Sequence, residues 1–173
     1  MVDATRIDEL ASWYEIYRLL CDYMRAQDRL LRDLHHSVFH DDATTDYGPF
    51  KGGPEAFITF AQGALAEHRA NHHMIGQVSI DFDGETAFGE VYFQAFHRIV
   101  DRDGVAQDMW VSGRYVDRYE RRESKWKIAH RSELVDWLRL EPASDAALLK
   151  LDWPMGARAP HDLSCDRDAL RTK

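Results

Sequence analysis

The spacing of apolar positions divides the chain into a helical first part and a later part rich in strands. Between Ile7 and Arg25 the apolar side chains recur at three- and four-residue steps, which predicts an amphipathic helix. A shorter second helix is expected from Arg29 to Val38. A third helix is expected to begin at Gly52-Gly53-Pro54, because proline suits the first helical position, and to end near Arg69.

After His72 the apolar and polar residues alternate, which is typical of half-buried strands. Phe39-His40-Asp41-Asp42 is interpreted as a turn before a short strand from Ala43 to Tyr47. Asp83-Gly84 is a strong signal for a tight hairpin. Strands joined by such short turns form an antiparallel meander, and they are expected at Val78 to Phe82, Thr86 to Val100, Gln107 to Tyr119 and Lys125 to Leu138.

This order of elements predicts an α+β fold. Three helices that precede a long, curved, mostly antiparallel sheet must fill its concave face, giving a cone-shaped α+β barrel with a cavity between the layers. We expect this cone domain over residues 1–140. Residues 141–173 contain Pro142, Pro154 and Pro160, and are expected to form a short helix and an irregular tail that packs on the pocket or on a neighbouring subunit.

Composition narrows the class of function. The chain has 173 residues, which suits one domain, and its formal net charge of −8 argues against nucleic-acid binding. No apolar run is long enough to cross a membrane, and the first residues do not resemble a signal peptide. Cys21 and Cys165 match no metal or redox spacing and are expected to be reduced thiols. These features predict a cytoplasmic protein that associates with neither nucleic acid nor membrane.

Two polar residues in apolar surroundings are candidates for acid/base chemistry. Asp28 lies between the first two predicted helices, where it could be an N-cap or a carboxylate at the mouth of the cavity. His73 lies where the first long strand begins. A neutral imidazole can take a proton near pH 7, and a neighbouring carboxylate can fix its tautomer; the alternative is a structural histidine. His72 and His73 should point to opposite faces of the strand.

Other residues are candidates for the pocket wall. Arg131 in the last strand could bind an anion or a polarised oxygen if it points inward, or be an ordinary surface residue if it points outward. His68 and His72 have a spacing that could suit a metal, but they lack a convincing third ligand, so we expect no metal site and no cofactor. Four aromatic residues could line a pocket for a ring-shaped ligand or belong to the core: Tyr23, Tyr47, Trp110 and Tyr115.

Several stretches within about residues 5–140 together resemble the SnoaL-like branch of the nuclear-transport-factor-like superfamily. That group includes polyketide cyclases, scytalone dehydratase and hexachlorocyclohexane dehydrochlorinase. The matching stretches are Tyr23-Met24-Arg25-Ala26-Gln27-Asp28, Phe39-His40-Asp41-Asp42-Ala43, Tyr47-Gly48-Pro49-Phe50-Lys51-Gly52, His72-His73-Met74, Asp117-Arg118-Tyr119-Glu120-Arg121-Arg122 and Trp126-Lys127.

The resemblance implies a catalytic pair of Asp28 and His73, with Arg131 at the position of an arginine in the dehydrochlorinase. The dehydrochlorinase carries a lysine where this chain has Tyr23. A tyrosine suits hydrogen bonding to a hydroxyl or carbonyl, which favours dehydration or carbon–carbon cleavage over halide elimination.

We therefore expect a cofactor-independent lyase that acts on a small hydrophobic cyclic or aromatic compound, with loss of water or of a small aldehyde. Two alternatives stay open: a ketosteroid-type isomerase, and a non-catalytic scaffold like the β subunit of ring-hydroxylating dioxygenases. The fold also implies a homo-oligomer, either a dimer or a trimer.

Overall fold

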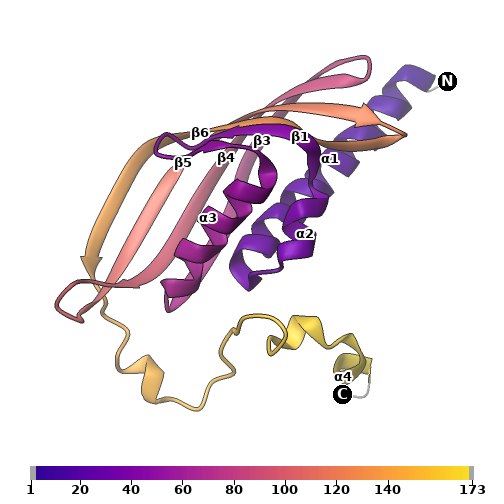
Figure 1. Cartoon of the computed structure of the whole chain (residues 1–173). Helices are drawn as coiled ribbons and strands as arrows, with labels where there is room; N and C mark the ends of the chain where they lie inside the picture. The colour runs from indigo at the N-terminus through magenta and orange to yellow at the C-terminus, as the bar shows by residue number, and fades with distance from the viewer. Residues whose placement is uncertain (1–2, 172–173) are drawn as a thin grey trace.

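The computed structural model describes residues 3–171 and contains three main helices, a six-stranded sheet and a C-terminal tail (Figure 1). The helices are α1 (Ala4–Arg29), α2 (Arg32–Ser37) and α3 (Pro54–Glu67). The strands are β1 (Phe39–Asp46), β2 (Lys51–Gly52), β3 (Ala70–Asp83), β4 (Thr86–Val100), β5 (Ala106–Arg122) and β6 (Lys125–Pro142). The tail holds η1 (Leu148–Lys150), η2 (Leu163–Cys165) and α4 (Arg167–Arg171).

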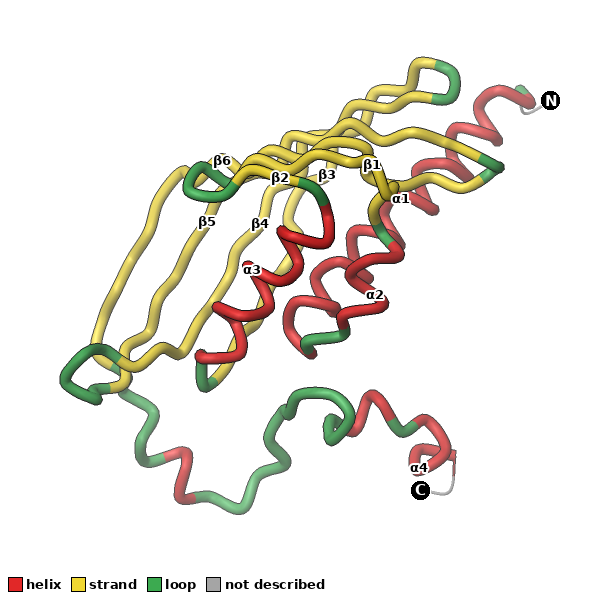
Figure 2. The backbone as a smooth tube through the Cα atoms, in the orientation of Figure 1, coloured by secondary structure: helices red, strands yellow, loops and turns green. Residues whose placement is uncertain are grey.

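The sheet arches over the three main helices, which lie along its concave side (Figure 2). Its strand order is β2-β1-β6-β5-β4-β3. The pairing of β1 with β6 is parallel, whereas every other neighbouring pair is antiparallel. The predicted α+β class and the mostly antiparallel, curved sheet are therefore confirmed.

The boundaries of α1 place Asp28 inside a helix. The helix begins after Asp3, whose side chain accepts a hydrogen bond from the Thr5 amide. It ends at Leu30, which adopts a left-handed conformation with φ of 55° and whose amide bonds the carbonyls of the last turn. Asp28 therefore lies in the last turn of α1, and the interpretation of Asp28 as the N-cap of the second helix is wrong.

Phe39-His40-Asp41-Asp42 is not a turn, because β1 begins at Phe39. The strand is held there by its parallel neighbour: Phe39 pairs with Ile128, and Asp46 pairs with Ser132. A pairing partner so distant in sequence leaves no local signal, so the two aspartates indicated a turn. The first long strand also begins earlier than its clearest alternation, at Ala70.

Two irregularities in β6 decide which of its side chains face the helices. Tyr119 pairs with Ile128 but Arg118 pairs with His130, so the register skips Ala129. Before this β-bulge the inward positions are even-numbered, and after it they are odd-numbered. A second register shift, opposite Ser112 and Gly113, changes again which positions of β6 face the helices near the end of the strand.

The core lies between α1, α3 and the concave face of the sheet. Its fully buried side chains include Ile16, Leu20, Phe57, Val91 and Ile128. The convex face of the sheet carries several large apolar side chains that remain exposed, among them Met74, Phe88, Tyr92, Val116, Leu134 and Trp137. Among residues 3–171 no helix is long and apolar enough to cross a membrane.

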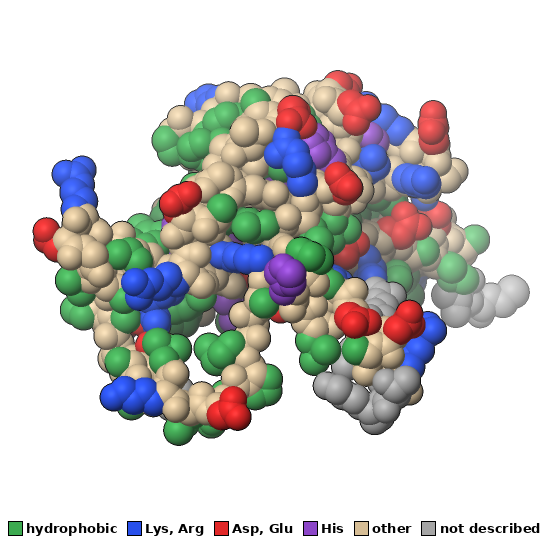
Figure 3. Space-filling model, turned by 60° about the horizontal axis from the view of Figure 1, so that its bottom comes forward, with side chains coloured by type: hydrophobic (Ala, Val, Ile, Leu, Met, Phe, Trp, Pro, Cys, Tyr) green, Lys and Arg blue, Asp and Glu red, His purple; other side chains and the backbone are tan. Residues whose placement is uncertain are grey.

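The tail leaves the end of β6 and runs below the helices to the C-terminal end of α1 (Figure 1). There the Ala159 amide donates to the Arg29 carbonyl at 3.1 Å, and Arg29 donates to the Ala157 carbonyl at 3.1 Å. Figure 3 views this side of the molecule, where apolar side chains lie along the tail. Trp153 and Met155 are exposed in the single chain.

Gly113 provides a test of the second irregularity in β6. A Cβ at this position would lie 2.0 Å from the Leu134 carbonyl oxygen, whereas a Cβ on Gly63 in α3 would meet nothing within 4 Å. We expect Gly113→Ala to lower the free energy of unfolding by about 1–3 kcal/mol. Gly63→Ala, the control, should raise it by about 0.5–1 kcal/mol. Urea denaturation measures both, and equal stability of the two variants would contradict this close approach.

Candidate active site

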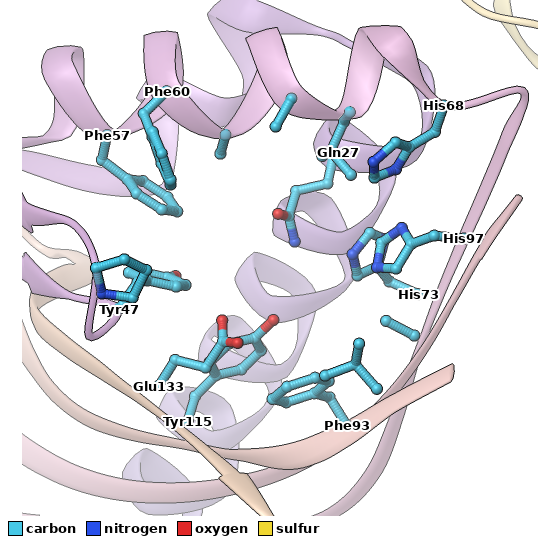
Figure 4. Close-up of a pocket in the computed structure, with 16 residues that line it drawn as sticks. Gln27, Tyr47, Phe57, Phe60, His68, His73, Phe93, His97, Tyr115 and Glu133 are labelled. Atoms are coloured by element: carbon cyan, nitrogen blue, oxygen red, sulfur yellow. The ribbon is translucent and has the colours of Figure 1, made fainter. Parts of the chain in front are cut away.

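A cavity of about 250 Å³ lies between α3, the end of α1 and the inner face of the sheet (Figure 4). Its walls are mostly apolar, with a small set of polar side chains pointing inward, which is the usual character of a small-molecule site. A cavity of about 150 Å³ is enough to bind benzene, so this one suits a single substituted ring. The lining residues used below are Gln27, Tyr47, Phe57, His68, His73, Phe93, His97, Tyr115 and Glu133.

His73 and Asp28 form a hydrogen-bonded pair beside this cavity. The His73 Nδ1 atom lies 2.7 Å from Asp28 Oδ1, and the His73 backbone amide donates to Asp28 Oδ2 at 3.1 Å. The side chains are only 6% and 10% exposed, respectively. Because a carboxylate accepts hydrogen bonds, Nδ1 carries a proton, and in the neutral form of the ring the free lone pair is on Nε2.

Asp28 supports His73 from behind. His73 lines the cavity and also a groove between α1 and β3, whereas Asp28 lines only the groove. Both carboxylate oxygens hold the same residue, one through its ring and one through its backbone. Asp28 can therefore orient the ring and stabilise the imidazolium without touching a molecule in the cavity.

The tail closes the same corner from outside through Arg158. Its guanidinium donates to the carbonyl oxygens of Asp28, Leu65 and His68, the last two at 3.1 and 3.4 Å. These acceptors belong to the last turn of α1 and to the C-terminal end of α3. The tail thereby links the two helix ends that flank the His73–Asp28 pair.

Two further histidines lie next to His73: His68, which the sequence suggested only as a possible metal ligand, and His97, which the sequence patterns did not single out. The ring of His97 lies 5.1 Å from that of His73 and 5.0 Å from that of His68. Asn71 Oδ1 lies 2.9 Å from Nδ1 of both His68 and His97, and Asn71 Nδ2 donates to the Leu65 carbonyl at 3.0 Å. This last bond fixes the amide orientation, because a carbonyl can only accept.

Asn71 Oδ1 must therefore accept a hydrogen bond from the Nδ1–H group of each ring. Burial lowers the pKa of His97 from 6.5 to about 3, and burial also lowers the pKa of His68. Both rings are therefore neutral at pH 7, with Nε2 unprotonated. His68, His73 and His97 form what we term the histidine end of the cavity, which presents acceptors rather than donors.

The structure separates the predicted tyrosines. Tyr47 and Tyr115 line the cavity, whereas Tyr23 is completely buried behind them. The hydroxyl oxygens of Tyr23 and Tyr47 are 2.6 Å apart. Burial raises the pKa of Tyr23 to about 12 and raises the pKa of Tyr47 well above 10, so both hydroxyls stay protonated.

Arg131 points inward but does not reach the cavity. Its guanidinium is fully buried between the rings of Tyr23 and Tyr115, whose centroids lie 4.2 and 4.1 Å away. Its Nε and Nη2 atoms donate to the Asp117 carboxylate at 2.8 and 2.6 Å. Arg131 thus points inward, as one of the two alternatives from the sequence had it, but the anion it binds is the Asp117 carboxylate beneath the cavity wall and not a molecule in the cavity.

Trp110 is not a wall of this cavity, which corrects the sequence-based interpretation. The inward positions of β5 are odd-numbered, since Tyr115 and Val111 line the cavity. Trp110 therefore lies on the opposite, convex face, where its ring centroid is 5.0 Å from that of Phe96. Strand alternation is visible in the sequence, but which set faces the helices depends on tertiary packing.

Gln27 and Glu133 are the polar wall residues that the sequence patterns missed. Gln27 is 5% exposed, and its buried Nε2 atom has no hydrogen-bond partner in the described part of the chain. Glu133 enters from β6, directly opposite Tyr115 in the strand pairing. The one signal for Glu133 in the sequence was strand alternation, which puts Glu133 on the same face as Arg131.

The described residues include no group of three or more His, Cys, Asp or Glu side chains placed to hold a metal ion.

Comparison with known proteins identifies the family. The sequence profile of the SnoaL-like domain matches residues 8–132, and the chain belongs to this family. An uncharacterized protein of Mycobacterium tuberculosis is 29% identical over 130 residues, covering 73% of this chain and 87% of that protein. A protein of Mycobacterium bovis, also uncharacterized, matches to the same extent.

Solved structures of low sequence identity share the fold. The hexachlorocyclohexane dehydrochlorinase LinA-type3 of Novosphingobium barchaimii has a TM-score of 0.70 at 19% identity, covering 87% of this chain and 99% of that chain. A candidate scytalone dehydratase from Novosphingobium aromaticivorans has a TM-score of 0.67 at 21% identity, covering 88% and 95%. At these identities the likeness establishes the fold alone, although the neighbours include lyase-type enzymes.

Buried neutral histidines predict acid sensitivity. Burial lowers the pKa values of His35 and His97 from 6.5 to about 3. Their contribution to stability is therefore present above pH 6.5 and lost as the pH falls towards 3. As the pH falls through that window, we expect each of these two histidines to lower the free energy of unfolding by up to about 1.4 kcal/mol per pH unit.

Urea denaturation at several pH values between about 7 and 4 measures this slope. His97→Gln should flatten it, whereas the control His161→Gln, at an exposed position of the tail, should leave it unchanged. An identical slope in wild type and His97→Gln would show that His97 is not buried in its neutral form.

Proposed function

We propose that this protein is a cofactor-independent lyase in which His73 is the general base and Asp28 is its orienting partner. The observation that supports this proposal most directly is the 2.7 Å contact between His73 Nδ1 and Asp28 Oδ1, in a histidine that lines the cavity and whose Nε2 has no hydrogen-bond partner within residues 3–171. Hydrogen-bond reach between a base and the group that orients it is the geometric requirement for this role.

The reaction begins with proton transfer from the substrate to His73 Nε2. Asp28 stabilises the resulting imidazolium through Nδ1–H. In a dehydration the proton comes from carbon, and the carbon–oxygen bond breaks as a double bond forms. In a carbon–carbon cleavage the proton comes from a hydroxyl, which becomes the carbonyl of a small aldehyde.

Shape and polarity of the cavity support a small cyclic or aromatic substrate. Phe57, Phe93 and Tyr115 supply flat apolar walls. The bare acceptors of the histidine end favour a substrate that carries hydroxyl donors, because an unpaired acceptor in a buried site costs binding energy. Tyr47 lines the cavity while Tyr23 lies behind it, which supports Tyr47 as the tyrosine that polarises a substrate oxygen.

The same pair of residues could also drive an isomerisation, in which the proton returns to a different atom. Product mass separates the two reactions, since an isomerase leaves it unchanged. A non-catalytic scaffold is the other alternative, and it would need a larger partner subunit for stable assembly.

Self-association through the convex face is a second part of the proposal. Exposed apolar side chains on neighbouring strands form a broad surface there, including Phe88 and Tyr92 on β4, Val116 on β5 and Trp137 on β6. Apolar patches of this kind on a sheet commonly mark protein interfaces. A homodimer or homotrimer would cover it.

His73→Ala tests the catalytic proposal. The purified protein is incubated with a panel of hydroxylated cyclic and aryl compounds, and products are identified by the loss of the mass of water or of an aldehyde. Removal of the general base should lower turnover by roughly 10²–10⁴-fold. Asp28→Asn should also lower turnover, because the amide no longer stabilises the imidazolium.

The matched control is His72→Gln. This exposed neighbour occupies the same strand but points to its other side. The control should keep wild-type turnover, and full turnover by His73→Ala would refute the role of His73.

Sedimentation of the purified chain tests self-association. We expect a single species of two or three subunits, and Trp137→Glu should shift it towards the monomer by placing a charge on the convex face. A wild-type monomer at micromolar concentration would argue against this interface.

A further inference from the structure

The cavity holds two further polar side chains, Gln27 from α1 and Glu133 from β6. In Figure 4, Glu133 lies across the cavity from the histidine end, and Gln27 lies between Glu133 and the histidines. Gln27 Nε2 is a buried donor without a partner, and within residues 3–171 no group hydrogen-bonds the Glu133 carboxyl. Buried polar groups are normally hydrogen-bonded, so the unpaired Gln27 Nε2 donor and the half-buried Glu133 carboxyl, both lining one cavity, indicate where a ligand binds.

Glu133 lacks a cation of its own, although Arg131 is two residues away on the same strand. The Arg131 guanidinium gives two hydrogen bonds to Asp117 and lies between two tyrosine rings. This ion pair is neutral overall, so it compensates only part of the cost of burying a second carboxylate. Burial raises the pKa of Glu133 from 4.5 to about 7, with Arg131 acting in the opposite direction.

The remaining ionisable neighbours of Glu133 do not add a positive charge. Tyr115 on β5, Tyr23 on α1 and Tyr47 after β1 stay protonated, because burial raises each of their pKa values. Across the cavity, His97 on β4 and His68 at the end of α3 are neutral. The His73–Asp28 pair on β3 and α1 carries one negative charge when His73 is neutral.

We propose that Glu133 enters the reaction as a neutral carboxylic acid and gives its proton to the substrate, while Gln27 Nε2 donates a hydrogen bond to the substrate oxygen. We term Gln27 and Glu133 the oxygen end of the cavity. The proposal rests on the lyase function above and adds the proton donor that complements the base. The substrate class it implies is a ring compound with a hydroxyl directed at each end.

The proton balance closes in both lyase reactions. In a dehydration, His73 takes a proton from carbon, the freed electron pair forms the double bond, and the departing oxygen takes the Glu133 proton and leaves as water. In a carbon–carbon cleavage, His73 takes the hydroxyl proton and the carbon that loses the aldehyde takes the Glu133 proton. In each case His73 returns its proton to Glu133 through solvent before the next cycle.

Carboxyl titration tests the protonation state without any substrate. Protein carrying ¹³C-labelled glutamate carboxyls is titrated by NMR. Wild type should show one carboxyl with a midpoint near pH 7, about 2 units above the ordinary glutamate range. The signal should be absent from Glu133→Gln and present in Glu9→Gln, a change at an exposed site of α1. If every glutamate titrates below about pH 5.5, the proposal fails.

Activity tests the role in catalysis. Glu133→Gln keeps the shape but cannot give a proton, so turnover should fall roughly 10²–10⁴-fold. In wild type the rate should decline as the pH rises through about 7, because Glu133 is then deprotonated. Glu133→Asp retains an acid and should recover part of the rate together with an alkaline decline, which a purely structural role would not produce.

The two proposals fail in different ways. Loss of activity in His73→Ala with full activity in Glu133→Gln would overturn the proton-donor role and leave the base intact. Full activity in His73→Ala would overturn the lyase mechanism. A Glu133→Gln variant that does not fold at pH 8 would overturn the account, because removing a carboxylate buried without a partner should stabilise the protein above pH 7.

Discussion

The buried ion pair of Arg131 and Asp117 is the interaction on which the rest of the site depends. Both side chains are completely buried; Arg131 lies between the aromatic rings of Tyr23 and Tyr115, and the Asp117 carboxylate also accepts a hydrogen bond from the Tyr119 hydroxyl. The pair joins β5 to β6 and holds α1 against the sheet through Tyr23. Removal of one partner from a buried pair typically costs about 3–5 kcal/mol. The positive charge of Arg131, which lies beneath the cavity wall, is therefore already neutralised by Asp117.

Because Asp117 neutralises Arg131, the two ends of the cavity differ chemically. At the histidine end Asp28 and Asn71 each engage Nδ1, so in the neutral rings the unprotonated nitrogen is Nε2. At the oxygen end Glu133 has no cation of its own to stabilise its deprotonated form. Preorganised acceptors at one side and donors at the other match a reaction in which a proton leaves one part of a molecule and another joins a second part. Arg158 supports this arrangement by binding the helix ends behind His73 and His68.

Much of the fold could be predicted from the sequence, because its signals are local. The periodicity of α1 and α3, Pro54 at a helix start and the Asp83-Gly84 hairpin all act within a few residues. The parallel pairing of β1 with β6 and the bulge at Ala129 have no such signal, since each depends on residues far away. For the same reason the outward orientation of Trp110 could not be predicted from the sequence. His73 and Asp28 could be singled out as polar residues at element ends, whereas His97 and Glu133 lie within long strands, where alternation alone cannot assign a role.

The protonation pattern of the histidine end is the most direct test of the account. Nitrogen-15 NMR of histidine-labelled protein at neutral pH distinguishes a protonated ring nitrogen from a bare one. The account predicts that His73, like His68 and His97, carries its proton on Nδ1 and has an unprotonated Nε2, and that Asp28→Asn perturbs His73 but not the other two. A His73 ring with its proton on Nε2, or one that Asp28→Asn leaves unchanged, would contradict a base oriented by Asp28.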